Sequence, residues 1–237
     1  MIRLLVFVFT LFSGPAFACE AVFHRDRAFT ICTADLSRDT ISLHLMGRDG
    51  EPLGSFVALE REVSDPIRFA MNAGMYHQDR RPVGLYIEDG RQTARLVTRE
   101  GPGNFGLLPN GVFCVMEGRA QVIESKAFEA DPPPCRHATQ SGPMLVIGGA
   151  LHPRFLPDSP SLKRRNGVGA TPDGRMVHFV ISDEPVTFHE MATLYRDVLG
   201  VRDALFLDGT VSRLYAPGID RHDTGWPMGP MVAVTGG

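Results

Sequence analysis

Residues 168–208 read VGATPDGRMVHFVISDEPVTFHEMATLYRDVLGVRDALFLD and contain both kinds of element that we expect in this chain. The apolar segments 168–170 and 176–182 are joined by Pro-Asp-Gly at 172–174, which predicts a β-hairpin. A further apolar run at 203–208 predicts another strand. A helix is predicted between the hairpin and this strand, so the stretch has the order hairpin, helix, strand.

The predicted helix covers about residues 187–199. Thr187 is suited to the N-cap, and Glu190 follows three residues later, as in a capping box. Apolar residues then recur at helical spacing from Met191 to Leu199, and Gly200 marks the end. No other segment has such a clear helical pattern, so we expect one main helix and few short ones.

Strand and turn signals dominate the rest of the chain. The 237 residues include 25 Gly and 18 Pro, more than usual, without a repeat, which favours many tight turns over long helices. The fold class predicted is therefore α+β: a single strand-rich domain with a mixed sheet, hairpins and one main helix. The further strands are predicted at 41–46, 68–71, 84–88, 111–116 and 120–123.

The first residues have the features of an export signal. Arg3 precedes the apolar run 4–12, and Ala-Phe-Ala at 16–18 has the form of a signal-peptidase site. We expect a signal peptide over 1–18, a mature domain over 19–237, and a periplasmic or secreted location. The apolar run is too short for a membrane span, which needs about 20 residues. Cys19 also follows the cleavage site as in a lipoprotein, but the residues before it lack the usual lipidation pattern, which makes this the weaker alternative.

The four cysteines all remain in the mature chain, and their even number permits full pairing in an oxidising compartment. Three pairings are open. We favour Cys19–Cys32 and Cys114–Cys135, because both close short loops next to predicted strands. No Cys-x-x-Cys spacing supports a zinc site, so metal ligation is the weaker interpretation.

Charge and motif content exclude several functions. A net charge of −3 and a longest basic run of three residues, 163–165, argue against a nucleic-acid partner. The Gly-Pro-Gly-Asn-Phe-Gly run at 101–106 leads into Pro109 and cannot open the helix of a dinucleotide site. His189-Glu190 lacks the second histidine of a zinc protease motif. We expect no cofactor and no metal, with a divalent cation as an alternative because Asp and Asn at loop edges suit calcium.

Polar residues gather instead at the predicted strand and helix ends. They are Asn72, Ser141, Arg165, Glu190 and Asp208. Two carboxylates and an arginine are the groups needed to cleave a glycosidic bond beside a phosphate: an acid, a base or nucleophile, and a bidentate anion contact. Each residue also has a structural alternative, namely a turn, a helix cap or a surface ion pair.

Five blocks in order then resemble the phosphodiester glycosidase family, with the motif-bearing part at about 68–216. The blocks are Asn-Ala-Gly-Met-Tyr at 72–76 with Pro-Val-Gly-Leu at 82–85, Ser-Gly-Pro-Met-Leu at 141–145, Arg-Asn-Gly-Val-Gly at 165–169, Glu190 in its helix, and Ala-Leu-Phe-Leu-Asp-Gly-Thr-Val-Ser at 204–212. Bacterial exported members related to the lysosomal uncovering enzyme are the most similar. Two blocks depart from the family: Ala-Gly-Met-Tyr replaces its usual Gly-Gly-Phe-Phe, and Thr210 stands where it has glycine.

The resemblance implies an exported hydrolase that cleaves a sugar-1-phosphodiester in a glycan or exopolysaccharide. Arg165 would hold the phosphate, and Asp208 and Glu190 would share the acid, base or nucleophilic work. Sugar contacts would come from Asn72, Tyr76 (or Phe105), Gln140, Ser141, Asn166 and Ser212.

Two alternatives from other classes remain open at this point. One is an exported carbohydrate-binding or envelope assembly protein that lacks turnover. The other is a serine-type esterase using Ser141 with His77 or His189, although Ser141 lacks the Gly-x-Ser-x-Gly elbow of common serine hydrolases.

Overall fold

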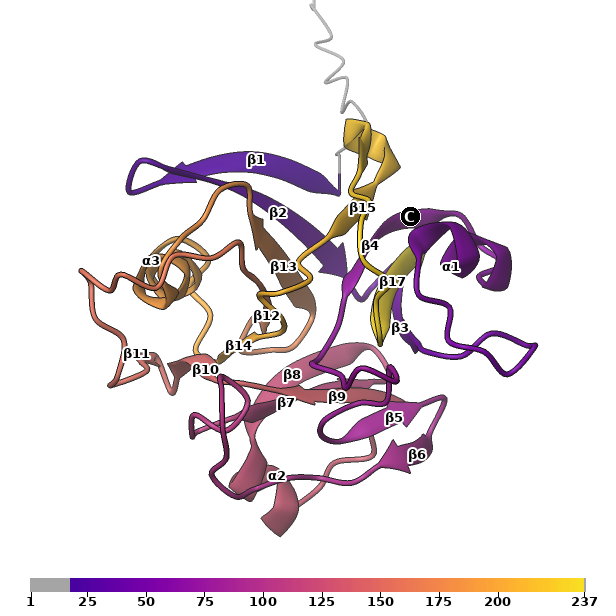
Figure 1. Cartoon of the computed structure of the whole chain (residues 1–237), viewed down its shortest axis with the longest axis horizontal. Coiled ribbons are helices and arrows are strands. Elements are labelled where there is room, and N and C mark those ends of the chain that lie inside the picture. Colours follow the sequence, from indigo (N-terminus) through magenta and orange to yellow (C-terminus); the bar gives the residue numbers. More distant parts are fainter. Residues whose placement is uncertain (1–17, 237) are drawn as a thin grey trace, which may run out of the picture.

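Three sheets of short strands make up the computed structural model, which describes residues 18–236 (Figure 1). The predicted signal peptide therefore lies almost entirely outside the described residues. No helix in the described part is long and apolar enough to cross a membrane.

Sheet A has seven strands and includes the three strands predicted within the segment 168–208. The predicted hairpin is confirmed: its two strands pair from Asn166 opposite Ile181 to Ala170 opposite Val177, and Gly174 in the turn has positive φ. The order across sheet A is β1 (Cys19–His24), β2 (Arg27–Asp35), β13 (Met176–Ser182), β12 (Asn166–Ala170), β14 (Ala204–Phe206), β10 (Met144–Ile147) and β11 (Ala150–Leu151).

A mixed sheet was expected, but every strand ladder among the described residues is antiparallel. The reason lies in the strand–helix–strand stretch. β13 and β14 run in the same direction, yet β12 lies between them and pairs antiparallel with both. The helical connection therefore produces no parallel ladder.

Sheets B and C have five strands each. Sheet B runs β16 (Arg221–His222), β15 (Leu214–Ala216), β4 (Ile67–Asn72), β17 (Met231–Gly236) and β3 (Asp39–His44). Sheet C, at the bottom of Figure 1, runs β6 (Arg91–Ala94), β5 (Tyr86–Glu88), β9 (His137–Ser141), β7 (Gly111–Met116) and β8 (Arg119–Glu124). The hairpin predicted across residues 117–119 is β7–β8, and the predicted Asp-Gly turn at 89–90 has positive φ at both residues, as a tight hairpin turn requires.

The three sheets share one apolar core. Phe179 of sheet A packs edge-on against Phe69 of sheet B, with ring centroids 5.6 Å apart, and against Phe113 of sheet C at 5.7 Å. All three side chains are fully buried, and aromatic edge-to-face contacts add to the stabilisation from buried area. Strand ends from different sheets therefore meet in fixed positions.

The main helix is confirmed as α3 (Phe188–Thr193), continued by a π-helical turn over Leu194–Val198. Thr187 and Glu190 form the predicted capping box, and Gly200 ends the element with positive φ. Two short helices were not located from the sequence: α1 (Phe56–Glu62) and α2 (Ser125–Ala130).

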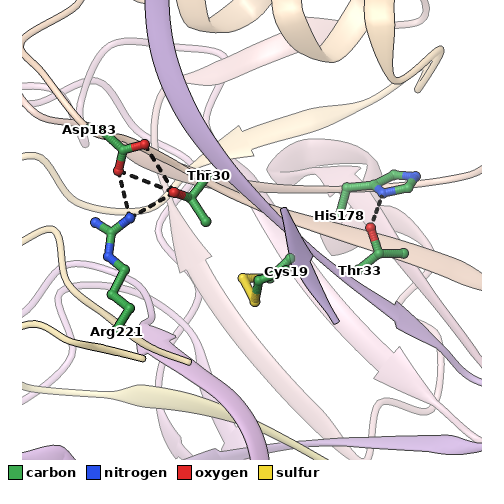
Figure 2. Close-up of a disulfide and its surroundings, with 7 residues drawn as sticks. Cys19, Thr30, Thr33, His178, Asp183 and Arg221 are labelled. Atoms are coloured by element: carbon green, nitrogen blue, oxygen red, sulfur yellow. Dashed lines mark hydrogen bonds and ion pairs between the residues drawn. A yellow bond between two sulfur atoms is a disulfide. The ribbon is translucent and has the colours of Figure 1, made fainter. Parts of the chain in front are cut away.

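Both favoured disulfides are present, Cys19–Cys32 and Cys114–Cys135. Cys19 lies directly opposite Cys32 in the β1–β2 ladder, so its bond joins two adjacent strands (Figure 2). In the same region Arg221 of sheet B donates hydrogen bonds to Asp183 at 2.6 Å and to Thr30 of sheet A at 2.8 Å. These contacts join one side of sheet A to sheet B.

Candidate active site

Two buried asparagines join sheets A and B at the site. Asn72 is the last residue of β4, and Asn166 is the first residue of β12. Asn72 Nδ2 donates to Asn166 Oδ1 at 3.3 Å, and Asn166 Nδ2 donates to the Asn72 carbonyl at 3.1 Å. The structure therefore brings two predicted site residues, 94 positions apart in sequence, into direct contact.

The same asparagines hold the loop that follows β14. Asn166 Oδ1 accepts the backbone N–H of Asp208 at 3.0 Å, and Asn72 Oδ1 accepts the N–H of Arg213 at 2.9 Å. Within the loop, Ser212 Oγ donates to the Asp208 carbonyl at 2.6 Å. Both ends of the segment 208–213 are thus fixed by amide side chains, and Asn72, Asn166, Asp208 and Ser212 form one network.

The Asp208 carboxyl group is nearly buried, with 9% of the residue exposed. Burial raises its pKa above the usual range, although the backbone N–H groups of Gly209, Thr210 and Val211 oppose this shift. Thr210 N–H donates to Asp208 Oδ1 at 2.9 Å. A carboxyl group that is held in place and has a raised pKa is suited to transfer a proton.

Asp208 lines a surface hollow of about 340 Å³. The hollow is formed by Met75, Tyr76, His77, Gln78, Val83, Asp208, Thr210 and Val211. Tyr76 Oη donates to the Pro227 carbonyl at 3.1 Å. Burial raises the pKa of Tyr76, and the negative charge of Asp208 adds to this shift. Tyr76 therefore lies in the hollow beside Asp208, whereas Phe105 is buried beside Gly84.

The Arg165 side chain makes contacts outside the Asp208 network. Arg165 directly precedes β12, and its side chain does not join that of Asn166. Its Nε donates to the Val186 carbonyl and its Nη2 to the Ser161 carbonyl, both at 2.9 Å. The guanidinium also lies 3.6 Å from the ring centroid of Phe188. Burial alone lowers its pKa to about 10, and its contacts are not shared with Asp208.

The Glu190 carboxylate likewise binds groups outside the Asp208 network. Its Oε2 accepts the Thr187 N–H at 2.7 Å, and its Oε1 accepts Arg27 Nε at 3.0 Å. Burial acts to raise the pKa of Glu190, but the hydrogen bonds from Thr187 and Arg27 outweigh it, so the pKa is lowered. Among the described residues, no hydrogen bond joins Glu190 to the Asp208 network.

Gln140 and Ser141 are fully buried at the end of β9. Gln140 Nε2 donates to the Val97 carbonyl at 2.6 Å and to Ser125 Oγ at 2.8 Å, and its Oε1 accepts two backbone N–H groups. Ser141 Oγ donates to the Leu207 carbonyl at 2.6 Å, directly before Asp208. This hydroxyl therefore fixes the start of the Asp208 loop and, within residues 18–236, has no histidine partner.

Sequence reasoning missed Arg213, which directly follows the last recognised motif residue. Its backbone N–H binds Asn72, and its buried side chain lies next to Tyr76 and Gly225. The only sequence feature that could have indicated Arg213 is its position directly after the motif residue Ser212. For metals, the described residues contain no group of three or more His, Cys, Asp or Glu side chains arranged to hold an ion.

Comparisons with known proteins identify relatives of the chain. The family model "Phosphodiester glycosidase" matches residues 65–235. A protein of Escherichia coli (strain K12), described as uncharacterized protein YigE, is 35% identical over 204 residues, which cover 85% of this chain and 80% of that protein.

Two solved structures share the fold. The catalytic domain of zebrafish N-acetylglucosamine-1-phosphodiester alpha-N-acetylglucosaminidase, auto-inhibited by its pro-peptide, has a TM-score of 0.60 at 13% identity, covering 92% of this chain and 81% of that one. A hypothetical protein from Synechocystis has a TM-score of 0.54, also at 13% identity, covering 92% and 61%.

Proposed function

Because the chain belongs to the phosphodiester glycosidase family, we propose that it hydrolyses a sugar-1-phosphodiester in the hollow beside Asp208. The observation that carries the proposal is the Asp208 loop, fixed at both ends by Asn72 and Asn166 and bearing a carboxyl group of raised pKa. In this reaction water adds to C1 of the sugar, the bond from C1 to the phosphate oxygen breaks, and a phosphomonoester leaves. Asp208 transfers the proton between the water and the departing oxygen.

The other predicted residues take supporting roles in this proposal. Tyr76 contacts the sugar, while Asn72, Asn166, Ser212 and Ser141 hold the Asp208 loop. Gln140 holds the backbone at Leu85 and Val97. We assign positioning roles to Arg165 and Glu190, because their polar groups bind Val186, Ser161, Thr187 and Arg27. Arg165→Met and Glu190→Gln are expected to reduce thermal stability more than turnover. If either variant instead loses as much turnover as an Asp208 variant while its stability is unchanged, that residue takes part in the reaction itself.

The two disulfides support function in an oxidising compartment, and we propose a periplasmic or secreted enzyme acting on a glycan or exopolysaccharide. The esterase alternative has less support, because Ser141 Oγ is buried and donates to Leu207.

The test incubates the mature chain with a phosphodiester that joins C1 of N-acetylglucosamine to 4-nitrophenol, in ¹⁸O-labelled water. Cleavage at C1 gives 4-nitrophenyl phosphate and labelled sugar, whereas cleavage at phosphorus gives nitrophenol. Asp208→Asn is expected to reduce kcat about 100- to 10,000-fold, and Asp197→Asn, at an exposed carboxylate on the π-helical turn, serves as the matched control. Label in the phosphate, or loss confined to Ser141→Ala, would refute the proposal. Sugar binding without turnover would favour the binding-protein alternative.

A further inference from the structure

Two segments of the chain form the hollow at Asp208. Residues 75–83 contribute five of its eight lining residues, and residues 208–211 contribute the other three. The second segment is fixed by the two buried asparagine side chains of the site. The shape of the hollow therefore depends also on what holds residues 75–83, here called the Tyr76 arm, opposite the carboxyl group.

The Tyr76 arm leaves sheet B beside the loop that enters β17. β4 ends at Asn72, and β17 begins at Met231, directly opposite Asn72 in an antiparallel ladder. The chain after Asn72 and the chain before Met231 therefore continue side by side beyond the sheet. Their first contact there is a hydrogen bond of 2.8 Å from the Ala73 N–H to the Pro230 carbonyl. The loop 227–230 is thus the immediate neighbour of the arm.

Two further carbonyls of this loop accept hydrogen bonds from side chains of the arm. Tyr76 Oη donates to the Pro227 carbonyl at 3.1 Å. Arg80 Nη1 donates to the Met228 carbonyl at 3.4 Å. Met228 is itself fully buried, and its N–H donates to the Gly54 carbonyl at 2.8 Å. The loop is therefore anchored in the fold and ties the arm to it.

Gly229 is the position at which the loop lies against the Tyr76 side chain itself. A Cβ at residue 229 would collide with Cγ of Tyr76 and stand 2.7 Å from its Cβ, whereas carbon atoms in favourable contact are about 3.5–4.0 Å apart. Because the Cβ of Tyr76 is fixed to its backbone, rotation of the ring alone does not relieve this collision. Gly229 does not have a positive φ. A glycine is therefore required here for space, and not for backbone conformation.

We propose that Gly229 is a positioning residue for the sugar: its missing side chain leaves room for Tyr76 and so sets the place of the Tyr76 arm opposite Asp208. The inference rests on the proposed function, in which the sugar occupies this hollow and contacts Tyr76. The Asp208 loop has anchors of its own, so Gly229 acts on sugar affinity and not on proton transfer. A loss of binding that is equal in the ground state and the transition state raises KM and leaves kcat unchanged.

The test compares Gly229→Ala with Gly101→Ala, using the same nitrophenyl phosphodiester. Gly101 is a matched control, because it also lacks a positive φ and its added methyl group would meet only the Cα of Gly106, at 4.0 Å. We expect KM to rise about 10-fold or more in Gly229→Ala, since small displacements of substrate contacts have effects of this size, while kcat stays within about threefold. Calorimetry with both glycine variants in the Asp208→Asn chain measures the Kd of the phosphodiester without turnover.

A double-mutant cycle shows whether Gly229 acts through Tyr76. Tyr76→Gly removes the atoms that the added methyl group would meet. We therefore expect Gly229→Ala to raise Kd and lower the midpoint of thermal unfolding in the Asp208→Asn chain, but to change neither further when Tyr76→Gly is also present. The same combination folds if Gly229→Ala alone does not, because it relieves the collision.

The outcomes separate this inference from the proposed function. Equal KM and Kd values for Gly229→Ala and Gly101→Ala, a fall in kcat with KM unchanged, or equal losses with and without the Tyr76 ring would overturn the positioning role and leave Asp208 chemistry intact. Weaker phosphodiester binding in Gly229→Ala, in a chain without turnover, supports the inference alone. Neither binding nor turnover by the natural chain would overturn both.

Discussion

Asn166 Oδ1 accepts the backbone N–H of Asp208 at 3.0 Å. The same oxygen faces Asn72 Nδ2 at 3.3 Å and Ser212 Oγ at 3.4 Å. One buried amide oxygen thus connects β4, β12 and the loop that carries the candidate catalytic carboxyl group. The position of Asp208 depends on contacts between two sheets as well as on its own strand.

Asn166→Ala is expected to lower the free energy of unfolding by about 3 kcal/mol, because it leaves buried donors without an acceptor and each such group costs about 1–3 kcal/mol. Turnover is expected to fall further than stability explains, since the Asp208 loop loses one of its two anchors. Urea denaturation and kcat measurements check this. Asn104→Ala, in an exposed loop, is the control, and equal effects in both variants would contradict the anchoring role.

The sequence predicted those hairpins and helices whose characteristic residues all lie within one short segment. The β7–β8 and β12–β13 hairpins combine apolar strands with Gly-containing turns, and α3 has a capping box. α1 and α2 are only 7 and 6 residues long, too short for an apolar stripe to recur over several turns.

Sequence motifs at strand ends also indicated some of the residues that the structure brings together. Asn72, Asn166, Asp208 and Ser212 belong to motifs that end strands or follow them, and the structure joins them. Arg165 and Asn166 are adjacent in the sequence, but only Asn166 joins the network. Arg165 directly precedes β12 and Asn166 begins it, and the motif does not specify which of the two side chains faces the site. Arg213 became visible only through its contacts with Asn72 and Gly225.

Asp208→Asn is expected to raise the free energy of unfolding at pH 7 while reducing turnover. The folded chain raises the pKa of Asp208, so ionisation favours the unfolded chain as the pH rises through the folded value. Below the unfolded pKa of about 3.9, both states are protonated and the gain disappears. Urea denaturation at pH 7 and pH 3 checks this. Asp197→Asn, at a carboxyl group whose pKa is lowered, is expected to give no gain at pH 7; a gain there as large as that of Asp208→Asn would contradict the explanation.

His137 is expected to make stability fall on mild acidification. Burial lowers its pKa to about 4, against the weaker effect of Asp89. Because the unfolded chain binds the proton near pH 6.5, stability declines between pH 6.5 and 4, by at most about 1.4 kcal/mol per pH unit from this residue. Denaturation of the natural chain and of His137→Gln at pH 7, 6 and 5 compares slopes, so that contributions from other histidines cancel. Parallel pH dependences would exclude His137 as the cause.

The two disulfides are expected to stabilise the fold without direct effects on turnover. Their cysteines are 13 and 21 residues apart, and closing loops of this size in the unfolded chain stabilises by about 3 kcal/mol each. Cys114 and Cys135 belong to a separate apolar cluster of sheet C, with Val112 and Phe128. Cys114→Ser/Cys135→Ser should therefore lower the midpoint of urea unfolding while kcat of the folded fraction stays within about twofold. A comparable fall in kcat below the unfolding transition would show that sheet C also controls the Asp208 loop, through Ser141 and its hydrogen bond to Leu207.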